Sequence, residues 1–154
     1  MRLSTNFILN EFVNDADPVK PDKAVIANLQ ELCRTVLEPL RTQLGKPIQI
    51  TSGYRSPVHN ARIGGAKGSM HCLGIAADIA VPGENHPNTT EQIKMARLLY
   101  QNPNVGGIGL YERKSIIHVD IREWVGSYPS MWLENRQGRY VKLPDHILAQ
   151  ITRG

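Results

Sequence analysis

The segment that most constrains the fold of this chain is an apolar stretch from Ile75 to Val81 with one aspartate inside it. Its larger side chains alternate with Ala76, Asp78 and Ala80, and this period of two predicts a β-strand with small residues on one face. An aspartate in such a strand is costly to bury unless it is paired, hydrogen-bonded or bound to a metal. Asp78 therefore indicates a polar site on one face of a sheet.

Two histidines accompany this aspartate in the sequence. His71 follows the glycine-rich run 64–68, which cannot hold a helix, so we expect it in a loop just before the strand. His118 and Asp120 interrupt a second apolar segment, 115–121, and their two-residue spacing places them on one face of a strand. Because a loop histidine and a strand aspartate can converge on one metal ion, these interruptions together indicate a functional site.

The rest of the chain predicts helices around a small antiparallel sheet, which is the α+β class. Apolar residues at three- and four-residue intervals predict a helix over 21–44, with a kink or break near Leu37 because of Pro39. Ser56 followed by Pro57 is typical of a helix start. The other expected elements are a strand at 48–51, a short helix ending near residue 62, a polar loop at 82–89, a helix at 90–101 and a hairpin over 105–121.

Length and composition indicate one globular domain. The chain has 154 residues, of which 41% are apolar and 21% charged, and these values are typical of a single packed domain. We expect this domain to cover 1–154, with its core at about 3–122 and a C-terminal extension at 123–154. The extension is predicted to end in a short helix over 145–151, and its aromatic residues among turn residues are Trp124, Trp132 and Tyr140.

Charge and hydropathy exclude some partners. No apolar run approaches the ~18 residues of a membrane span, so we expect no membrane partner. The net charge of +4 suits an anionic polymer such as a bacterial wall or a nucleic acid. No predicted helix carries clustered Lys and Arg, and no stacking aromatics occupy strand positions, so a nucleic-acid partner is not expected. We expect a monomer in which both cysteines, Cys33 and Cys72, are free thiols.

Three motifs occur in the order and spacing of a known family. They are Thr51-Ser52-Gly53-Tyr54-Arg55-Ser56, then Ser69-x-His71-x-x-Gly74-x-Ala76-x-Asp78, and finally Ile117-His118-Val119-Asp120. Together they resemble the zinc D-Ala-D-Ala carboxypeptidase-like peptidases of the M15 family, in particular its short single-domain branch from bacteria and phages. The resemblance covers about residues 3–122 and implies the D-Ala-D-Ala carboxypeptidase/hedgehog-like zinc fold.

The resemblance also implies an activity and a metal site. The activity is zinc-dependent hydrolysis of peptide bonds in the stem peptides of peptidoglycan, by a D-Ala-D-Ala carboxypeptidase or an endopeptidase. The implied zinc ligands are His71, Asp78 and His118, and three nitrogen and oxygen donors leave a fourth position for water, as in catalytic zinc sites. Arg55 is expected to clamp a substrate carboxylate or the developing oxyanion.

Two neighbouring residues are further candidates for substrate binding. Ser69 either hydrogen-bonds the substrate or orders its own loop. Tyr54 either lines the cleft or packs under Arg55.

The general base is the point at which this chain departs from the family. Many relatives place an acidic residue three positions before the last histidine ligand, but here this position is Ser115. We predict Asp120 as the replacement, because it shares a strand face with His118, and Glu112 as the second choice. The alternative for Asp120 is that it orients a ligand histidine or Arg55.

Two functions follow from these observations. The first is a peptidase made in the cytoplasm without a Sec signal, since polar residues follow the N-terminus too soon for an apolar signal core. It would act at the bacterial cell wall or in the periplasm, and a phage or prophage endolysin fits this description. The alternative is a catalytically weak, metal-containing cell-wall-binding module on the same fold, which is motivated by the missing acid at Ser115.

Overall fold

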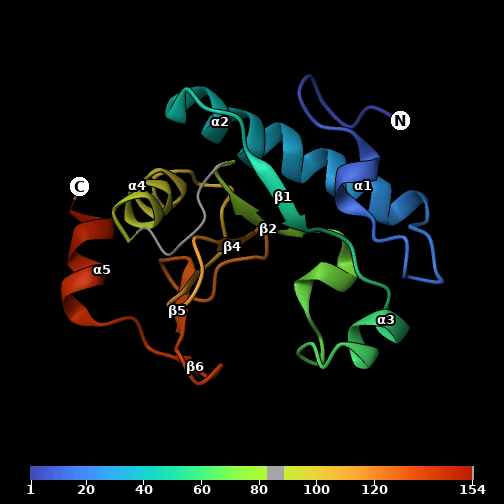
Figure 1. Cartoon of the computed structure of the whole chain (residues 1–154). Helices are drawn as coiled ribbons and strands as arrows, with labels where there is room; N and C mark the ends of the chain where they lie inside the picture. The colour runs from blue at the N-terminus through green and yellow to red at the C-terminus, as the bar shows by residue number, and fades with distance from the viewer. Residues whose placement is uncertain (83–88, 154) are drawn as a thin grey trace.

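Helices and a six-stranded mixed sheet make up the protein (Figure 1), and the predicted α+β class is confirmed. The computed structural model describes residues 1–82 and 89–153. The strands lie in the order β1-β2-β4-β3-β5-β6. Their bounds are β1 Gln49–Ser52, β2 Ala76–Ala80, β3 Gly107–Tyr111, β4 Ile117–Asp120, β5 Ser130–Glu134 and β6 Tyr140–Val141.

The α-helices lie close to their predicted positions, whereas His71, expected in a loop, lies in the short 3₁₀ turn Met70–Leu73. The helix predicted at 90–101 begins one residue earlier, and the loop predicted at 82–89 lies mostly outside the described residues. No helix in the described part of the chain has the length and apolar character needed to cross a membrane. The helical segments are η1 Leu9–Phe12, α1 Lys23–Leu32, η2 Cys33–Leu37, α2 Glu38–Leu44, α3 Pro57–Arg62, η3 Met70–Leu73, α4 Thr89–Tyr100 and α5 Asp145–Thr152.

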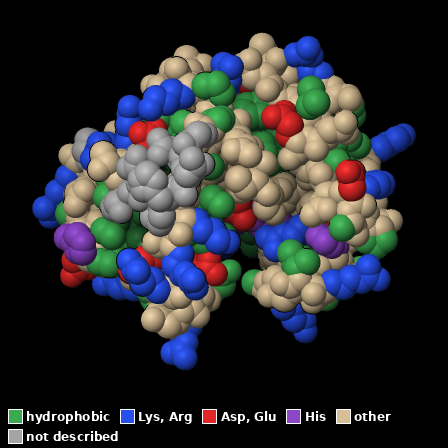
Figure 2. Space-filling view, viewed as in Figure 1, with side chains coloured by type: hydrophobic (Ala, Val, Ile, Leu, Met, Phe, Trp, Pro, Cys, Tyr) green, Lys and Arg blue, Asp and Glu red, His purple; other side chains and the backbone are tan. Residues whose placement is uncertain are grey.

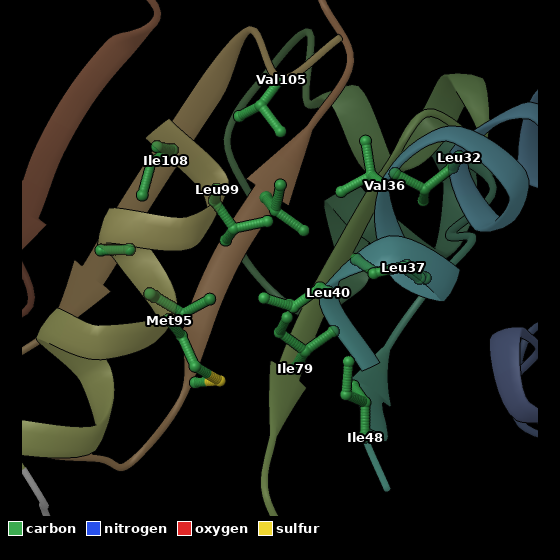
Figure 3. Close-up of a cluster of buried hydrophobic side chains, with 14 of the residues drawn as sticks. Leu32, Val36, Leu37, Leu40, Ile48, Ile79, Met95, Leu99, Val105 and Ile108 are labelled. Carbon is green, nitrogen blue, oxygen red and sulfur yellow. The ribbon is translucent and has the colours of Figure 1, made fainter. Parts of the chain in front are cut away.

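Alternation along the strands separates a core face of the sheet from a polar face. In β2, Ala77 and Ile79 are fully buried in the core, so Asp78 between them points to the opposite face. In β4, Ile117 and Val119 take the core side in the same way. Figure 3 shows side chains from α1, η2, α2, β2 and α4 packed together in this core. The helical segments α1, η2, α2 and α4 thus cover one face of the sheet and leave the other available for a site.

The long helix breaks at the predicted place. Pro39 has no N–H, so the carbonyl of Thr35 lacks the donor that a regular α-helix supplies. The chain widens into the π-helical turn η2, in which the amide of Glu38 bonds the carbonyl of Cys33. Asn102, after α4, donates to the freed carbonyl of Thr35 at 2.8 Å. The break therefore also joins this helix to the rest of the core.

The sheet is mixed, which corrects the expectation of a wholly antiparallel one. Four of the five strand pairings are antiparallel, but β3 and β5 run parallel. The parallel pair arises because residues 121–129 carry the chain back to the start of β3 before β5 begins. There the amide of Ser130 donates to the carbonyl of Gly106 at 2.9 Å. The C-terminal extension therefore supplies two strands of the sheet, together with the predicted helix α5.

The N-terminal segment fixes the chain that carries Arg55. Phe12 is buried, and a Cβ at Gly53 would lie 2.6 Å from the Cα of Phe12. The amide of Tyr54 donates to the Phe12 carbonyl at 2.7 Å. Asp17 accepts hydrogen bonds from the amide and the hydroxyl of Ser56 at 2.7 and 2.6 Å. The backbone on both sides of Arg55 is thus tied to residues far away in sequence.

Asp17 is buried, with 4% of its surface exposed. Burial would raise the pKa of its carboxyl, but hydrogen bonds from Ser56 and from the amide of Val19 hold that pKa below the ordinary 3.8. A carboxyl with a lowered folded pKa stabilises the fold above its unfolded pKa, and this contribution is lost as the pH falls through the folded value.

Asp17→Asn is expected to lower the free energy of unfolding at pH 7 by about 1–3 kcal/mol, because it replaces a charged acceptor by a neutral one. The difference from wild type should shrink as the pH falls below about 4, where Asp17 of the unfolded chain takes up a proton, and should vanish below the lowered pKa of folded Asp17. Urea unfolding at several pH values measures both effects. Asp15→Asn, at an exposed neighbouring position, is the control. A difference that stays constant over the whole pH range would show that the charge of Asp17 does not stabilise the fold.

Candidate metal centre

Three side chains with ligand atoms converge on the polar face of the sheet. His71 comes from η3, Asp78 from β2 and His118 from β4, and one ligand atom of each lies within 4.8 Å of the others. Asp78 and His118 are direct neighbours in the register of β2 and β4. Oδ1 of Asp78 lies 3.3 Å from Nε2 of His71 and 3.1 Å from Nδ1 of His118. The residues predicted as metal ligands therefore lie around one point.

The orientation of His71 is set by its own turn and by a backbone carbonyl. Ser69 caps η3 by accepting a hydrogen bond from the His71 amide at 3.3 Å, and Gly74 ends the turn with a φ of 76°. On the ring, Nδ1 donates to the carbonyl of Gly53 at 2.7 Å, since a carbonyl can only accept. The lone pair of the neutral ring then stands on Nε2. This atom is buried and has no hydrogen-bond partner in the described part of the chain.

His118 is held by a carboxylate on the side away from Asp78. Its Nε2 lies 2.7 Å from Oδ2 of Asp120, a residue with no exposed surface. Arg122 binds both oxygens of that carboxylate, through Nε at 2.8 Å and Nη2 at 2.6 Å. Because this ion pair keeps Asp120 ionised, Asp120 accepts the Nε2 proton of His118, and in the neutral ring the Nδ1 lone pair is directed toward Asp78.

Burial and hydrogen bonding act in opposite directions on the charges of this cluster. Burial would raise the pKa of Asp78, but contacts with the His118 and His71 imidazoles lower it far below its usual range. Burial disfavours a charged His118, yet the carboxylates of Asp120 and Asp78 raise its pKa. Burial also opposes ionisation of Asp120, but His118 and Arg122 lower its pKa to about 2. The cluster is therefore arranged to hold positive charge at its centre.

The donor set fits a zinc ion. Two imidazole lone pairs and one carboxylate oxygen directed at the same point repel one another unless a cation lies between them. Ligands of tetrahedral zinc stand about 3.3 Å apart, close to the 3.1 and 3.3 Å separations around Oδ1 of Asp78. Two histidines and one carboxylate are also typical of catalytic zinc sites. A metal would supply the partner that the buried Nε2 of His71 lacks.

A cleft of about 660 Å³ opens above this cluster. One wall is the glycine-rich loop 65–69, which includes Ser69. The opposite wall comes from β3, β5 and β6, through Tyr111, Trp132, Glu134 and Tyr140. Figure 2 shows the surface hollowed between the part over α3 and the part over β6, with basic side chains around the opening. The ligand atoms are therefore reachable from solvent by a substrate.

Arg55 lies where this cleft meets a second cavity of about 520 Å³. Residues 10–15 of the N-terminal segment line the second cavity. The Nε of Arg55 is buried and has no hydrogen-bond partner among the described residues. Tyr54 is 6% exposed and packs in the core at the wall of the second cavity. Of the three residues predicted to contact the substrate, Arg55 is therefore the one that borders both cavities.

The two carboxylates considered for the general base occupy different environments. Glu112 lies on the turn after β3, where it accepts the amide of Arg136 at 2.8 Å, and it does not line the cleft. Asp120 lies beside His118, with both of its oxygens engaged.

Sequence reasoning did not anticipate that β5 contributes Trp132 and Glu134 to the cleft. The available indication was local. Met131 and Leu133, which pack against the core, alternate with these two residues at the period of a strand.

A histidine–aspartate–histidine cluster on the floor of a cleft is an arrangement of metallohydrolases. The sequence model of the peptidase M15 family matches residues 5–120, so the chain belongs to this family and the resemblance is confirmed. Two similar proteins are the peptidoglycan L,D-endopeptidase MepK of Escherichia coli (strain K12) and that of Shigella flexneri. Each is 36% identical over 87 residues, which cover 51% of this chain and 44% of the relative. The chain thus spans less than half the length of these curated relatives.

The purified protein is expected to bind one zinc ion per chain, and His71→Ala is expected to bind it at least about 100-fold more weakly, since it removes a ligand. Metal content after dialysis and competition with a chromophoric chelator measure the two affinities. Zinc at 100 times its dissociation constant should also stabilise the wild type by about 2.7 kcal/mol. His146→Ala, exposed on α5, is the matched control. Equal zinc affinity of wild type and His71→Ala would refute the site.

Proposed function

We propose that this protein hydrolyses peptide bonds in the stem peptides of peptidoglycan and that the reaction depends on zinc. The observation that carries the proposal is the buried Nε2 of His71, aimed with Asp78 and His118 at one point on the floor of a cleft. Membership of the peptidase M15 family supports peptide hydrolysis, and the name of the relatives supports peptidoglycan as the substrate class.

In this proposal His71, Asp78 and His118 hold the metal. Bound zinc supplies a Lewis acid, which lowers the pKa of water to about 7 and polarises the scissile carbonyl. The protein keeps both imidazoles aimed by binding their outer nitrogens, through the Gly53 carbonyl and the Asp120 carboxylate. Partners of this kind fix the tautomer and the ring orientation and make the imidazole a better donor.

We assign Arg55 to substrate recognition. Its amide donates to the carbonyl of His71 at 3.2 Å, which ties its backbone to that of a metal-ligand residue. Its guanidinium borders both cavities, and guanidinium groups bind a carboxylate or a developing oxyanion through paired hydrogen bonds. Ser69 lines the cleft from the loop 65–69, which lies beside Arg55, and is the second polar contact that we assign to substrate. Tyr54 supports the Arg55 side of the cleft from the core.

We assign to Asp120 the role of orienting His118, and not that of the general base. A base must reach the attacking water, but Asp120 has no exposed surface and is bound by His118 and Arg122. Glu134 lines the cleft, and no hydrogen bond or ion pair with a described residue engages its carboxylate. We therefore propose Glu134 as the base, in place of Asp120 and Glu112.

The shape of the cleft favours an endopeptidase over a carboxypeptidase. The two cavities share the lining residues Ser52, Arg55 and Ile63, so a second space lies next to the one above the metal-ligand cluster, on the side of the N-terminal segment. An internal bond of a longer or cross-linked peptide needs room on both sides of the reacting atoms. The relatives are named as endopeptidases, which supports the same choice.

The proposed place of action is the bacterial cell wall. A net charge of +4 suits a protein that approaches anionic wall polymers. We further propose that the protein is a lysis enzyme of a phage or prophage and that it is active as a monomer.

Zinc-loaded protein is expected to release products from purified muropeptides, and to cut cross-linked muropeptides faster than a linear stem peptide ending in D-Ala-D-Ala. Mass spectrometry of the products identifies the bond, and His71→Ala should release none. Release of only the terminal D-Ala would contradict the endopeptidase assignment. Zinc binding without any product would refute hydrolysis and indicate the metal-containing wall-binding module.

Glu134→Gln is expected to lower kcat about 10²- to 10⁴-fold, which is the usual contribution of a general base. Its zinc affinity should stay at the wild-type value, because Glu134 is outside the proposed ligand set. Asp120→Asn should instead weaken zinc binding about 10–100-fold, as outer partners of ligand histidines do. Steady-state kinetics and chelator competition measure the two quantities separately.

Glu112→Gln is the control for both substitutions, since Glu112 lies on a turn outside the cleft. A kcat of Glu134→Gln close to that of Glu112→Gln would exclude Glu134 as the base.

A further inference from the structure

Trp132 stands at the end of a row of residues that crosses the sheet through two of the proposed metal ligands, Asp78 and His118. Ser52 pairs with Asp78 in the register, and Asp78 pairs with His118. His118 pairs with Gly109, and Gly109 pairs with Trp132. Members of such a row lie on one face of the sheet, at a spacing of about 4.8 Å from strand to strand. Gly109 has no side chain, so no side chain from β3 separates His118 from Trp132.

The ring of Trp132 occupies the space above Gly109. A Cβ at Gly109 would lie 2.5 Å from Nε1 of Trp132, which is closer than such atoms approach. The ring reaches His118, with centroids 5.1 Å apart and planes inclined by 48°. The ring of His71 also contacts His118, with centroids 5.1 Å apart and planes inclined by 70°. His118 is therefore in contact with two rings as well as hydrogen-bonded to Asp120.

Trp132 also contacts the residue that holds Asp120. The guanidinium carbon of Arg122 lies 5.2 Å from the centroid of the Trp132 ring, within the range of a cation–π contact. The same guanidinium binds both oxygens of Asp120, and Asp120 binds Nε2 of His118. Trp132 thus touches both ends of the series His118–Asp120–Arg122 and closes it into a ring of contacts.

We propose that Trp132 is a positioning residue of the metal centre, which sets the orientation of His118 both by direct packing and through Arg122. The proposal rests on the metal site of the proposed function but not on the reaction. In this proposal β5 helps to build the site, although it lies beyond residues 5–120, which match the family.

The test measures zinc affinity and the visible absorption spectrum of bound Co²⁺. Trp132→Leu is expected to weaken zinc binding about 10–100-fold and to change the Co²⁺ spectrum, because the His118 ring loses its support. Trp132→Phe, which keeps a ring against His118, should restore most of the affinity. Trp124→Phe is the matched control, since Trp124 is 42% exposed and bonds the carbonyl of Val105 away from the cleft.

Gly109→Ala tests the same contact from the other side, because the added methyl group must displace the Trp132 ring. It is expected to weaken zinc binding in the wild-type background and to have little further effect in Trp132→Leu. The double variant should therefore lose less affinity than the sum of the single losses.

Wild-type zinc affinity and an unchanged Co²⁺ spectrum in folded Trp132→Leu would overturn the proposal, and so would additive losses in the double variant. These readouts do not use hydrolysis. A wild-type protein that binds zinc and cuts no muropeptide would refute the proposed function alone.

Discussion

The site depends on the carboxylate of Asp78, which stands in an interior strand of the sheet. Its neighbours Ala77 and Ile79 are buried in the core, so the strand leaves Asp78 no orientation except toward the opposite face. A carboxylate held there needs positively charged or donating partners. His71 and His118 reach the same point from two other elements with their lone pairs, so a bound cation would be the partner that all three share. Each histidine then needs a group that binds its outer nitrogen. Much of the surrounding structure supplies those groups and holds them in place.

Much of this arrangement follows from local sequence patterns. The period of two around Asp78 and around His118 predicts two strands whose polar residues share a face, and the structure pairs these residues directly. The sequence also predicts that Ser56 caps α3 and that the chain before Pro39 leaves the regular helix, because each of these effects acts over a single turn of chain. The convergence of His71 with the two strand residues was accessible through the motifs of the M15 family.

What the sequence patterns do not reveal depends on contacts between distant segments. The parallel pairing of β5 with β3 is decided by the path of residues 121–129, and nothing within β5 specifies its partner. Trp132 and Glu134 therefore could not be placed at the cleft from local periodicity alone. Asp120 shows the same limit, since its spacing from His118 predicts a shared face but not that Arg122 occupies its oxygens.

The pair formed by Asp120 and Arg122 also affects the charge of the centre. Their charges cancel, so among the ligands and their direct partners Asp78 carries the charge that a bound dication must balance. A dication held by one carboxylate and two neutral imidazoles keeps one net positive charge, whereas two carboxylates would neutralise it. A residual positive charge strengthens the pull on a carbonyl oxygen. In the proposed zinc site, Arg122 would thereby favour Lewis-acid chemistry without being one of the metal ligands.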